Sequence, residues 1–357
     1  MKGRVLVVGF TTRHVAQSAT LAGYEVCAVD HFCDQDLSWY TRDRIRFEDI
    51  SDIPGAISQL CNRYSFDFAV ATSGAEDISF PVPLCGTPRD RVERFLDKLT
   101  MQHFFEELKV PVPRIAGDGH YPVMAKPRRG AGGWRNAILN DNLAEKKWAA
   151  LFPDIPYIRQ EVAEGVPASV CCIANGYAAK AIAVNEQILR ETGESAFGFS
   201  GSVTPFDHPL AKEMVKIAEK VAGASGCIGC LGIDFVVGND VPYVIEMNPR
   251  FQGTLDTIEA AYACNLFRFH VNACAGMLPE PPRPQIFAAR RILFADRDLT
   301  LDADLKVFAP VVSDIPWPGT FFEEGQAITS VSGTGPSRNA AFGTLDKNIS
   351  TVRQYMR

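Results

Sequence analysis

The stretch Tyr243-Val244-Ile245-Glu246-Met247-Asn248-Pro249-Arg250 places a carboxylate, an amide and a guanidinium at alternate positions of one strand-like run. Asp234 lies twelve residues before Glu246, in a second run that reads as a strand. Two carboxylates facing a polyanion would repel it unless divalent cations lay between them. Oxygen ligands of this kind suit Mg²⁺, which binds one or two carboxylates together with substrate phosphates. The stretch therefore predicts a site for a metal-bridged polyphosphate.

The two runs are expected to form a hairpin around the turn Gly238-Asn239-Asp240. With a three-residue loop, residue 237 pairs with 241, and Glu246 lies diagonally across from Asp234. Cross-strand neighbours share a face, so Asp234, Glu246 and Asn248 would project to the same side. A two-residue loop would turn Asp234 to the opposite face and destroy the site. The alternative is a surface hairpin with a polar outer face, but the apolar residues beside Asp234 favour a buried sheet.

Composition excludes several classes of protein. The chain has 357 residues, of which 46% are hydrophobic and 22% are charged, which is typical of a soluble globular protein with two or three domains. The net charge of −6 argues against general nucleic-acid binding. No apolar run is long enough for a membrane span, and the apolar start is too short for a signal peptide.

Ten cysteines are scattered through apolar runs, which indicates reduced core thiols in a cytoplasmic protein. Cys227-Ile228-Gly229-Cys230 has the spacing of a metal knuckle, but no second pair or histidine group follows it. We interpret it as a buried pair of thiols.

Residues 1–88 alternate strand-like and helix-like segments, which favours a parallel sheet with ligands at the strand carboxyl ends. Asp30 follows Gly9 at the distance found in dinucleotide domains. However, Gly9-Phe10-Thr11-Thr12-Arg13-His14 lacks the second and third glycines that approach a pyrophosphate, so a nicotinamide-dependent oxidoreductase is disfavoured. Arg13 and the two hydroxyls predict either an anion site or a helix cap by Thr11 or Thr12, and the sequence favours neither.

A proline-rich break at residues 81–88 precedes one expected long amphipathic helix over residues 89–108. A strand carrying Lys126 follows, and then the loop Arg128-Arg129-Gly130-Ala131-Gly132-Gly133. Such a loop exposes backbone N–H groups and can fold over phosphates, while Lys126 supplies positive charge. It is not a Walker loop, because the lysine precedes the glycines.

In these motifs, the chain resembles the ATP-grasp superfamily of carboxylate–amine ligases over roughly residues 89–275. The resemblance extends to a group of archaeal and bacterial predicted ATP-dependent carboligases, related to biotin carboxylase and to tyramine–glutamate ligase, through Asn248-Pro249-Arg250-Phe251-Gln252-Gly253-Thr254-Leu255-Asp256. The implied fold class is α/β and α+β, an ATP-grasp fold behind a Rossmann-like parallel-sheet domain. The expected parts are an N-terminal domain at 1–88, a central subdomain with the glycine-rich lid at 89–165, and a C-terminal subdomain with the metal site at 166–357.

The resemblance also implies site residues. ATP would be bound by Lys98, Lys126, Arg128, Gly130, Gly132, Gly133, Gln160, Glu161, Val162 and Glu164. Mg²⁺ (or Mn²⁺) would be held by Asp234, Glu246 and Asn248, while Lys126 and Arg250 would act in catalysis. Tyr157-Ile158-Arg159-Gln160-Glu161-Val162-Ala163-Glu164-Gly165 resembles the hinge strand that meets the adenine in this family. Many relatives carry an acid for the ribose hydroxyls several residues after this strand. Val166-Pro167-Ala168-Ser169 lacks one here, and Glu164 is the candidate replacement.

The implied reaction has two steps. A substrate carboxylate attacks the γ-phosphate of ATP to give an acyl phosphate and ADP, and an amine then displaces phosphate. The expected partners are a small-molecule carboxylate and an amino acid or small amine, with no nucleic acid and no membrane, and the resemblance implies a homodimer. Selectivity is expected at Thr11–His14, Ser73–Glu76 and residues 250–257.

Two alternative functions stay open. The chain could bind nucleotide without turnover as a regulatory protein, or it could stop at a phosphorylated product as a phosphotransferase. Individual side chains also have structural interpretations. Lys98 could be an ordinary surface charge, and Arg250 could pair with Asp256 or Glu259.

Overall fold

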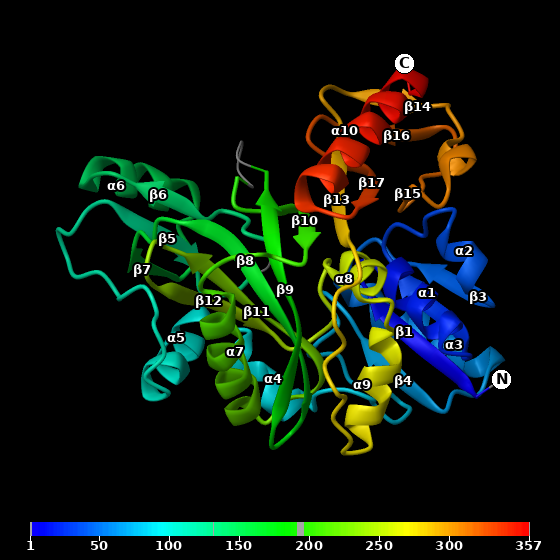
Figure 1. The fold of residues 1–357 in the computed structure, drawn as a ribbon, viewed down its shortest axis with the longest axis horizontal. Coiled ribbons are helices and arrows are strands. Elements are labelled where there is room, and N and C mark those ends of the chain that lie inside the picture. The colour runs from blue at the N-terminus through cyan, green and yellow to red at the C-terminus, as the bar shows by residue number, and fades with distance from the viewer. Residues whose placement is uncertain (1, 131, 191–195, 357) are drawn as a thin grey trace.

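The structure is a computed structural model that describes residues 2–130, 132–190 and 196–356. Ala131 of the glycine-rich loop lies outside the described residues. Within the described part of the chain, the strands form four sheets (Figure 1). No helix in these ranges is long and apolar enough to cross a membrane.

The N-terminal unit contains a parallel sheet with the strand order β3-β2-β1-β4, as predicted. Its elements are β1 (Arg4–Gly9), α1 (Arg13–Leu21), β2 (Glu25–Asp30), α2 (Leu37–Tyr40), β3 (Asp43–Arg46), η1 (Ile50–Asp52), α3 (Ile53–Arg63) and β4 (Phe68–Ala71). Helices cover both faces of this sheet, because α1 packs on the side of Val5 and Val7 and α3 on the side of Leu6 and Val8, so the apolar runs of β1 and β2 are buried. A β-carbon at Gly9 would lie 2.0 Å from the Thr72 hydroxyl, so only glycine allows β1 to end against the β4 turn.

The helix expected over residues 89–108 is interrupted. It consists of α4 (Arg89–Val92), η2 (Glu93–Phe95) and α5 (Lys98–Glu107). Asp97 is extended, with φ −112° and ψ 116°, and its carboxylate accepts hydrogen bonds from the backbone N–H groups of Leu99 and Thr100. The prediction of one helix was wrong because Asp97 is an N-cap, which starts a second helix at Lys98.

The second sheet has three antiparallel strands in the order β6-β5-β7. Its elements are β5 (Val123–Pro127), β6 (Ala137–Leu139), α6 (Asn142–Leu151) and β7 (Tyr157–Glu161). Lys126 lies on β5, and the glycine-rich loop joins β5 to β6. A small core around Val123, Ala125 and Trp148 fixes α6 to this sheet.

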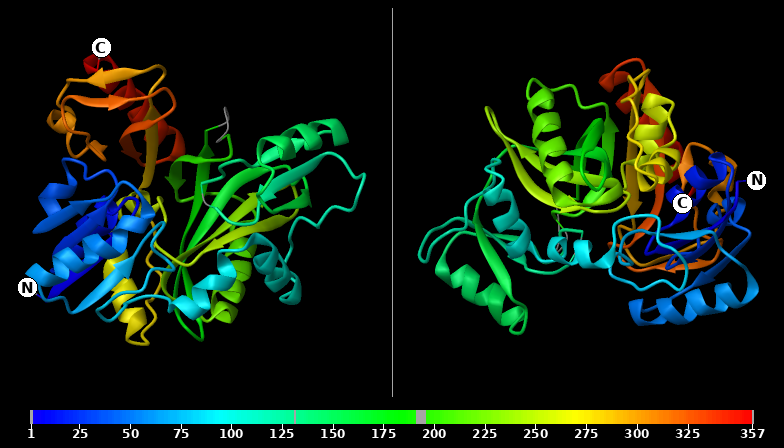
Figure 2. Two further views of the ribbon diagram at one scale, coloured as in Figure 1. Left: turned by 180° about the vertical axis from the view of Figure 1, so that it is seen from behind. Right: turned by 90° about the horizontal axis from the view of Figure 1, so that it is seen from below.

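The largest sheet has eight strands in the order β12-β11-β8-β9-β10-β13-β17-β15. Its first part contains β8 (Val166–Asn175), β9 (Ala179–Leu189), β10 (Phe199–Thr204), α7 (Ala211–Ser225), β11 (Ile228–Val237), β12 (Pro242–Asn248), α8 (Leu255–Tyr262) and α9 (Leu266–Cys274). Figure 2 shows that the three-stranded sheet and the N-terminal sheet lie on opposite sides of it. Phe251, Leu255 and Ile258 are buried in the core between α8, α9 and the N-terminal unit.

The C-terminal lobe extends the same sheet, because β13 pairs with β10. Its elements are β13 (Phe287–Phe294), β14 (Leu299–Leu301), η3 (Leu305–Phe308), β15 (Val312–Ser313), β16 (Thr320–Phe322), β17 (Ala327–Gly335) and α10 (Arg338–Tyr355). Within this lobe, β14 and β16 form a separate two-stranded antiparallel sheet.

The hairpin of β11 and β12 differs from its predicted register. Val237 pairs with Pro242 rather than with residue 241, so the loop has four residues, Gly238–Val241. Continued without interruption, this register would place Asp234 opposite Ile245 and turn Glu246 to the other face. A β-bulge between Asp234 and Phe235 shifts the pairing by one residue and sets Asp234 directly opposite Glu246. The predicted shared face is correct, but a bulge produces it rather than a three-residue loop.

Candidate active site

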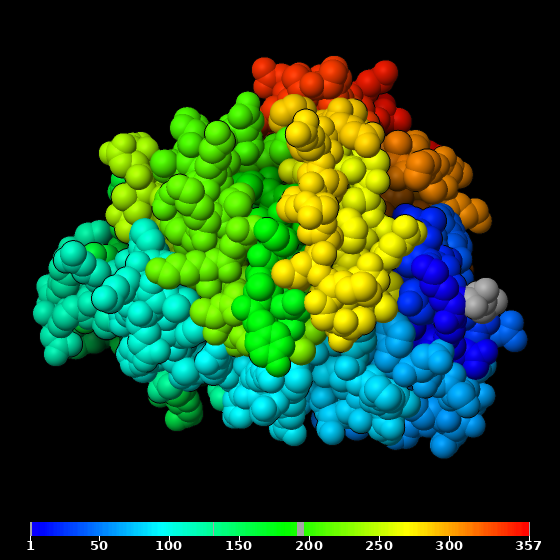
Figure 3. Space-filling view, turned by 60° about the horizontal axis from the view of Figure 1, so that its bottom comes forward, coloured from blue at the N-terminus to red at the C-terminus, as the bar shows by residue number. Residues whose placement is uncertain are grey.

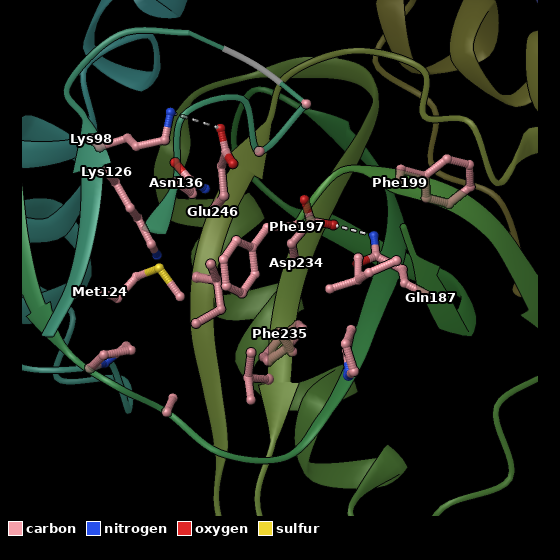
Figure 4. A pocket seen from close by; sticks show the side chains of 18 of the residues that line it. Lys98, Met124, Lys126, Asn136, Gln187, Phe197, Phe199, Asp234, Phe235 and Glu246 are labelled. Carbon is pink, nitrogen blue, oxygen red and sulfur yellow. Dashed lines mark hydrogen bonds and ion pairs between the residues drawn. The ribbon is translucent and has the colours of Figure 1, made fainter. Parts of the chain in front are cut away.

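A cavity of about 410 Å³ lies between the three-stranded sheet and the β11–β12 edge of the eight-stranded sheet (Figure 4). The predicted residues that line it are Lys98, Lys126, Gly132, Gly133, Gln160, Glu161, Val162, Asp234, Glu246, Asn248 and Arg250. One wall therefore carries lysines and the opposite wall carries carboxylates. The structure brings together in one cavity most of the residues that the motifs indicated.

Two lysines form the basic wall. Lys98 is the first residue of α5, and its ammonium donates a hydrogen bond to the Gly130 carbonyl at 2.7 Å. The same ammonium lies 3.8 Å from Glu246 (Figure 4), so the surface-charge interpretation of Lys98 is wrong. Burial lowers the pKa of Lys126 to about 8. Attraction to Glu246 opposes this shift, while repulsion from Lys98 adds to it. A polyanion entering between the lysines would stabilise both charges.

The glycine-rich loop adopts backbone conformations that favour glycine. Gly130, Gly132 and Gly133 have φ values of 124°, 69° and 67°. A β-carbon at Gly133 would lie 2.5 Å from the Phe197 carbonyl oxygen, so this glycine lets the loop contact the segment before β10. Gly130 does not line the cavity, but its carbonyl orients Lys98.

Arg128 was expected to bind ATP, but its side chain points to another part of the molecule. Its guanidinium lies 2.7 Å from the Asp97 carboxylate, the cap of α5, and it does not line the cavity. The Arg128 carbonyl accepts a hydrogen bond from the Lys98 backbone N–H. Arg128 therefore joins the glycine-rich loop to the start of α5.

The hinge between β7 and β8 forms one end of the cavity. Gln160 is buried, and its amide nitrogen donates to the Gln102 side-chain oxygen at 2.7 Å. The Gln160 side-chain oxygen is buried without a hydrogen-bond partner among the described residues, so it can accept from a ligand N–H group. Glu161 and Val162 line the same end. Glu164 instead lines a neighbouring hollow beside the Gly238–Val241 loop.

Asp234 and Glu246 face the cavity from adjacent strands. Three side-chain amides donate hydrogen bonds to Asp234, from Gln187 and Asn248 at 2.9 Å and from Gln252 at 3.2 Å. Burial, followed by repulsion from Glu246, raises the pKa of Asp234 to about 7. A divalent cation between the two carboxylates would relieve this repulsion, so the donor set fits Mg²⁺.

Asn248 connects Asp234 to Arg250. Its amide nitrogen donates to Asp234, and its amide oxygen accepts from the Arg250 guanidinium at 3.1 Å. Arg250 pairs with Glu76 at 2.5 Å rather than with Asp256 or Glu259, so the expected structural partners were wrong. Glu76 follows β4, within the predicted selectivity segment. The N-terminal unit thus places a carboxylate on the arginine at the end of the cavity.

Two acceptors on the loop after Arg250 lie in the predicted selectivity segment, residues 250–257, although the sequence assigned neither of them an individual role. The Gln252 side-chain oxygen and the Thr254 hydroxyl line the cavity and are buried with no hydrogen-bond partner among the described residues. Gln252 lies against Gly232, where a β-carbon would be 1.6 Å from its amide carbon. Gln187 was missed, because it reaches Asp234 from β9, across β8, and only tertiary structure brings these strands together.

Arg13 does not form an anion site. It is 2% exposed, and its guanidinium lies 2.5 Å from Asp256, 2.9 Å from Asp314 and 3.6 Å from Asp36. The Thr12 hydroxyl donates to Asp30, and neither threonine caps α1 through its side chain. Thr12 therefore occupies the N-cap position of α1 without the expected side-chain cap, and the anion-site interpretation was wrong because internal carboxylates occupy the Arg13 guanidinium. Arg290 joins the cluster by pairing with Asp314 and donating to the Gly253 carbonyl.

Comparisons with known proteins agree with this geometry. Residues 95–254 match the ATP-grasp domain family. An uncharacterized protein of Methanocaldococcus jannaschii is 23% identical over an alignment that covers 92% of this chain and 87% of that protein.

Solved structures show the same fold. The biotin carboxylase domain of 2-oxoglutarate carboxylase from Hydrogenobacter thermophilus, solved with MgADP, ADP and bicarbonate, superposes with a TM-score of 0.79 at 14% identity, covering 98% of this chain and 89% of that chain. Phosphoribosylamine–glycine ligase from Thermotoga maritima gives 0.75 at 17% identity, covering 97% and 96%. The expected ATP-grasp fold is therefore confirmed.

Proposed function

We propose that this chain, whose residues 95–254 form an ATP-grasp domain, is an ADP-forming ligase that joins a carboxylate to an amine through an acyl phosphate. The observation that carries the proposal is the opposition of two lysines and two carboxylates across one cavity that ends at Arg250. Such an arrangement suits a nucleotide polyphosphate with a divalent cation and leaves a guanidinium beside the terminal phosphate.

The nucleotide would enter with its base at the hinge. The free Gln160 side-chain oxygen would accept from the adenine amino group, and Lys98 and Lys126 would bind phosphate oxygens. Gly132 and Gly133 would cover the phosphates. Glu164 lies outside this cavity, so its proposed contact with the ribose requires the nucleotide to reach the neighbouring hollow.

Asp234 and Glu246 would hold Mg²⁺ or Mn²⁺, which would neutralise phosphate charge during transfer. Asn248 would join them as a third ligand when its amide oxygen turns away from Arg250. Arg250 would stabilise the negative charge that develops on the transferred phosphoryl group and the acyl phosphate. Closure of the glycine-rich loop would exclude water from that intermediate.

The second half of the reaction needs a nucleophile that donates hydrogen bonds. The Gln252 side-chain oxygen can only accept, and leaving a buried acceptor unpaired costs about 1–3 kcal/mol. Thr254 offers a second oxygen beside it. An amine supplies N–H donors to both oxygens, which supports an amino acid or small amine as the acceptor substrate.

Trapping with hydroxylamine tests the proposal without knowledge of the natural amine. Hydroxylamine intercepts acyl phosphates as hydroxamates, so a panel of carboxylic acids can be screened with MgATP for hydroxamate and ADP. We expect one acid class to give both products in equal amounts. The Asp234→Ala/Glu246→Ala variant should give neither, while Glu213→Ala, which removes an exposed carboxylate from α7 outside the cavity, should keep most of the activity.

The open alternatives predict other results. Tight MgADP binding with no ADP release for any acid would favour a regulatory nucleotide-binding protein. A stable phosphorylated product that hydroxylamine does not consume would favour a phosphotransferase.

A further inference from the structure

A cluster of two thiols and an imidazole lies outside the candidate active site. The ligand atoms of Cys85, His270 and Cys274 all lie within 4.8 Å of one another. Cys85 belongs to the segment that leaves the N-terminal sheet, and its backbone N–H donates to the Ala69 carbonyl. Cys274 is the last residue of α9. The cluster therefore joins the N-terminal unit to the helix that packs on β11.

The imidazole has no free lone pair for a metal. Its Nδ1 accepts a hydrogen bond from the Cys230 backbone N–H at 2.9 Å. Its Nε2 lies 2.9 Å from the Cys85 carbonyl oxygen, which can only accept, so Nε2 carries the proton. Gly229 makes room for the ring, since a β-carbon there would lie 2.4 Å from Nδ1. Zinc would have to break one of these buried hydrogen bonds, so the cluster offers two thiols rather than a three-ligand metal site.

The two thiols differ in exposure and acidity. Cys274 is partly exposed, whereas Cys85 is buried. The neighbouring Cys85 thiol lowers the pKa of Cys274, and the same interaction raises the pKa of Cys85. Oxidants react with the thiolate form of cysteine, and the solvent exposure of each thiolate decides which one reacts. Figure 3 shows the yellow segment around α9 at the surface between the green central strands and the blue N-terminal unit.

We propose that Cys85 and Cys274 are an oxidative modification site that hydrogen peroxide converts to a disulfide between the N-terminal unit and α9. The Cys274 thiolate attacks peroxide, forming a sulfenic acid and releasing hydroxide as the O–O bond breaks. The Cys85 thiol then attacks the sulfenic sulfur. An S–S bond forms, and water leaves with the thiol proton and the sulfenic hydroxyl group.

The chain contains a matched control for this proposal. The sulfur atoms of Cys171 and Cys230 are 3.7 Å apart on β8 and β11, but both residues are buried. Proximity alone would oxidise both pairs, whereas proximity with solvent access would oxidise only Cys85 and Cys274. The partly exposed Cys33 and Cys61 report how far single thiols react under the same conditions.

The experiment treats the folded full chain with hydrogen peroxide, blocks remaining thiols with iodoacetamide during unfolding, and maps peptides by mass spectrometry. We expect a dithiothreitol-sensitive link between the Cys85 and Cys274 peptides and a melting temperature several degrees higher. Cys171→Ser should retain the link, while Cys85→Ser should lose it and accumulate sulfenic or sulfinic acid at Cys274.

Absence of the link in the wild-type chain overturns the proposal, whether or not Cys274 is oxidised. An equal yield of a Cys171–Cys230 link also overturns it, because oxidation would then follow unfolding. The wild-type map gives the decision even if the serine variants do not fold. The result is independent of the proposed ligase activity, since it requires neither substrate nor turnover.

Discussion

Arg13 and Arg250 were both expected to face anions, yet they lie in opposite kinds of environment. Arg13 is surrounded by Asp36, Asp256 and Asp314 in the interior, where parts of the N-terminal unit, α8 and the C-terminal lobe meet. Arg250 has one carboxylate partner, Glu76, and lines the cavity. The difference lies in the charge balance around each guanidinium. The three internal carboxylates around Arg13 leave no place for an external anion. The single carboxylate on Arg250 can be displaced by an anion or can share the guanidinium with it.

The largest expected effect is on stability. Arg13→Met leaves Asp36, Asp256 and Asp314 with less cationic compensation in the interior. Removing one partner of a buried charge cluster costs about 3–5 kcal/mol. We expect the free energy of unfolding in urea to fall by this amount. Arg250→Met, in the same denaturation experiment, should change it by less than half as much, and equal losses would remove the distinction between the two arginines.

Catalytic activity should depend on Arg250 more than on Arg13, the reverse of their order in stability. Arg250→Met should lower kcat for hydroxamate formation about 10²–10³-fold, because a charge aimed at the transition state is lost. The affinity for MgADP, measured by calorimetry, should change less than about fivefold, since the lysines hold the nucleotide. A loss confined to nucleotide affinity would show that Arg250 binds the ground state only.

Gly232→Ala extends the comparison to a residue without charge. The new methyl group would occupy the place of the Gln252 amide, and the flexible end of that side chain can move away. We expect kcat/KM for the amine to fall about 10–100-fold, as expected when one or two substrate hydrogen bonds are lost. The yield of ADP with hydroxylamine, a much smaller nucleophile, should fall less, and equal losses would point to damage at Asp234 instead.

The charge of the Lys126 ammonium is only partly balanced by the nearby carboxylate. Because its pKa is about 8, the effect of losing this charge can be measured by changing the pH. The ammonium loses its proton as pH rises through 8, whereas a bound polyphosphate favours the charged form. Nucleotide affinity should therefore fall up to about tenfold between pH 8 and 10, a range in which Asp234, with a pKa of about 7, stays ionised. Lys126→Arg stays charged over this range. The nucleotide affinity of this variant should not fall between pH 8 and 10. A fall of the same size as in the wild type would show that a group other than Lys126 titrates in this range.

Glu76→Gln should have the smallest effect, a change in anion binding, and it tests directly whether the number of carboxylates distinguishes Arg250 from Arg13. Loss of the one carboxylate on Arg250 should strengthen binding of small anionic ligands about 2–5-fold, measured by competition with ADP. Asp314→Asn, which removes one of three carboxylates from Arg13, should leave anion binding unchanged. Weaker binding in Glu76→Gln would mean that Glu76 orients Arg250 rather than competing with ligands.

Local sequence predicted the parts of the fold and site that depend on spacing within one element. The alternation of Glu246, Asn248 and Arg250 placed all three on the cavity side of β12 and its end. The apolar runs predicted the parallel N-terminal sheet, and the lysine before the glycines predicted one wall of the cavity. These features survive because side-chain direction follows the strand period.

Features that depend on distant segments could not be predicted in this way. Arg13 meets Asp314, 301 residues later in the chain, and nothing near Arg13 indicates that partner. Gln187 and Gln252 surround Asp234 from different elements. Asp97 was predicted to lie inside one helix because the pattern around it is helical, whereas in the structure its carboxylate caps α5 and interrupts that helix. In each case, the local sequence pattern was compatible with more than one structure, and a single long-range contact or helix cap determined which structure formed.

The bulge beside Asp234 separates the length of the hairpin loop from the geometry of the metal face. Directly paired residues share a face whatever the loop length, so a change confined to the loop would leave Asp234 opposite Glu246 as long as Val237 stays paired with Pro242. The spacing between Pro242 and Glu246 has no such freedom. One residue inserted there would bring Ile245 opposite Asp234 and turn Glu246 to the other face, although every ligand would remain in the sequence. The metal face therefore depends on the exact length of β12 before Glu246, while the loop can vary without changing it.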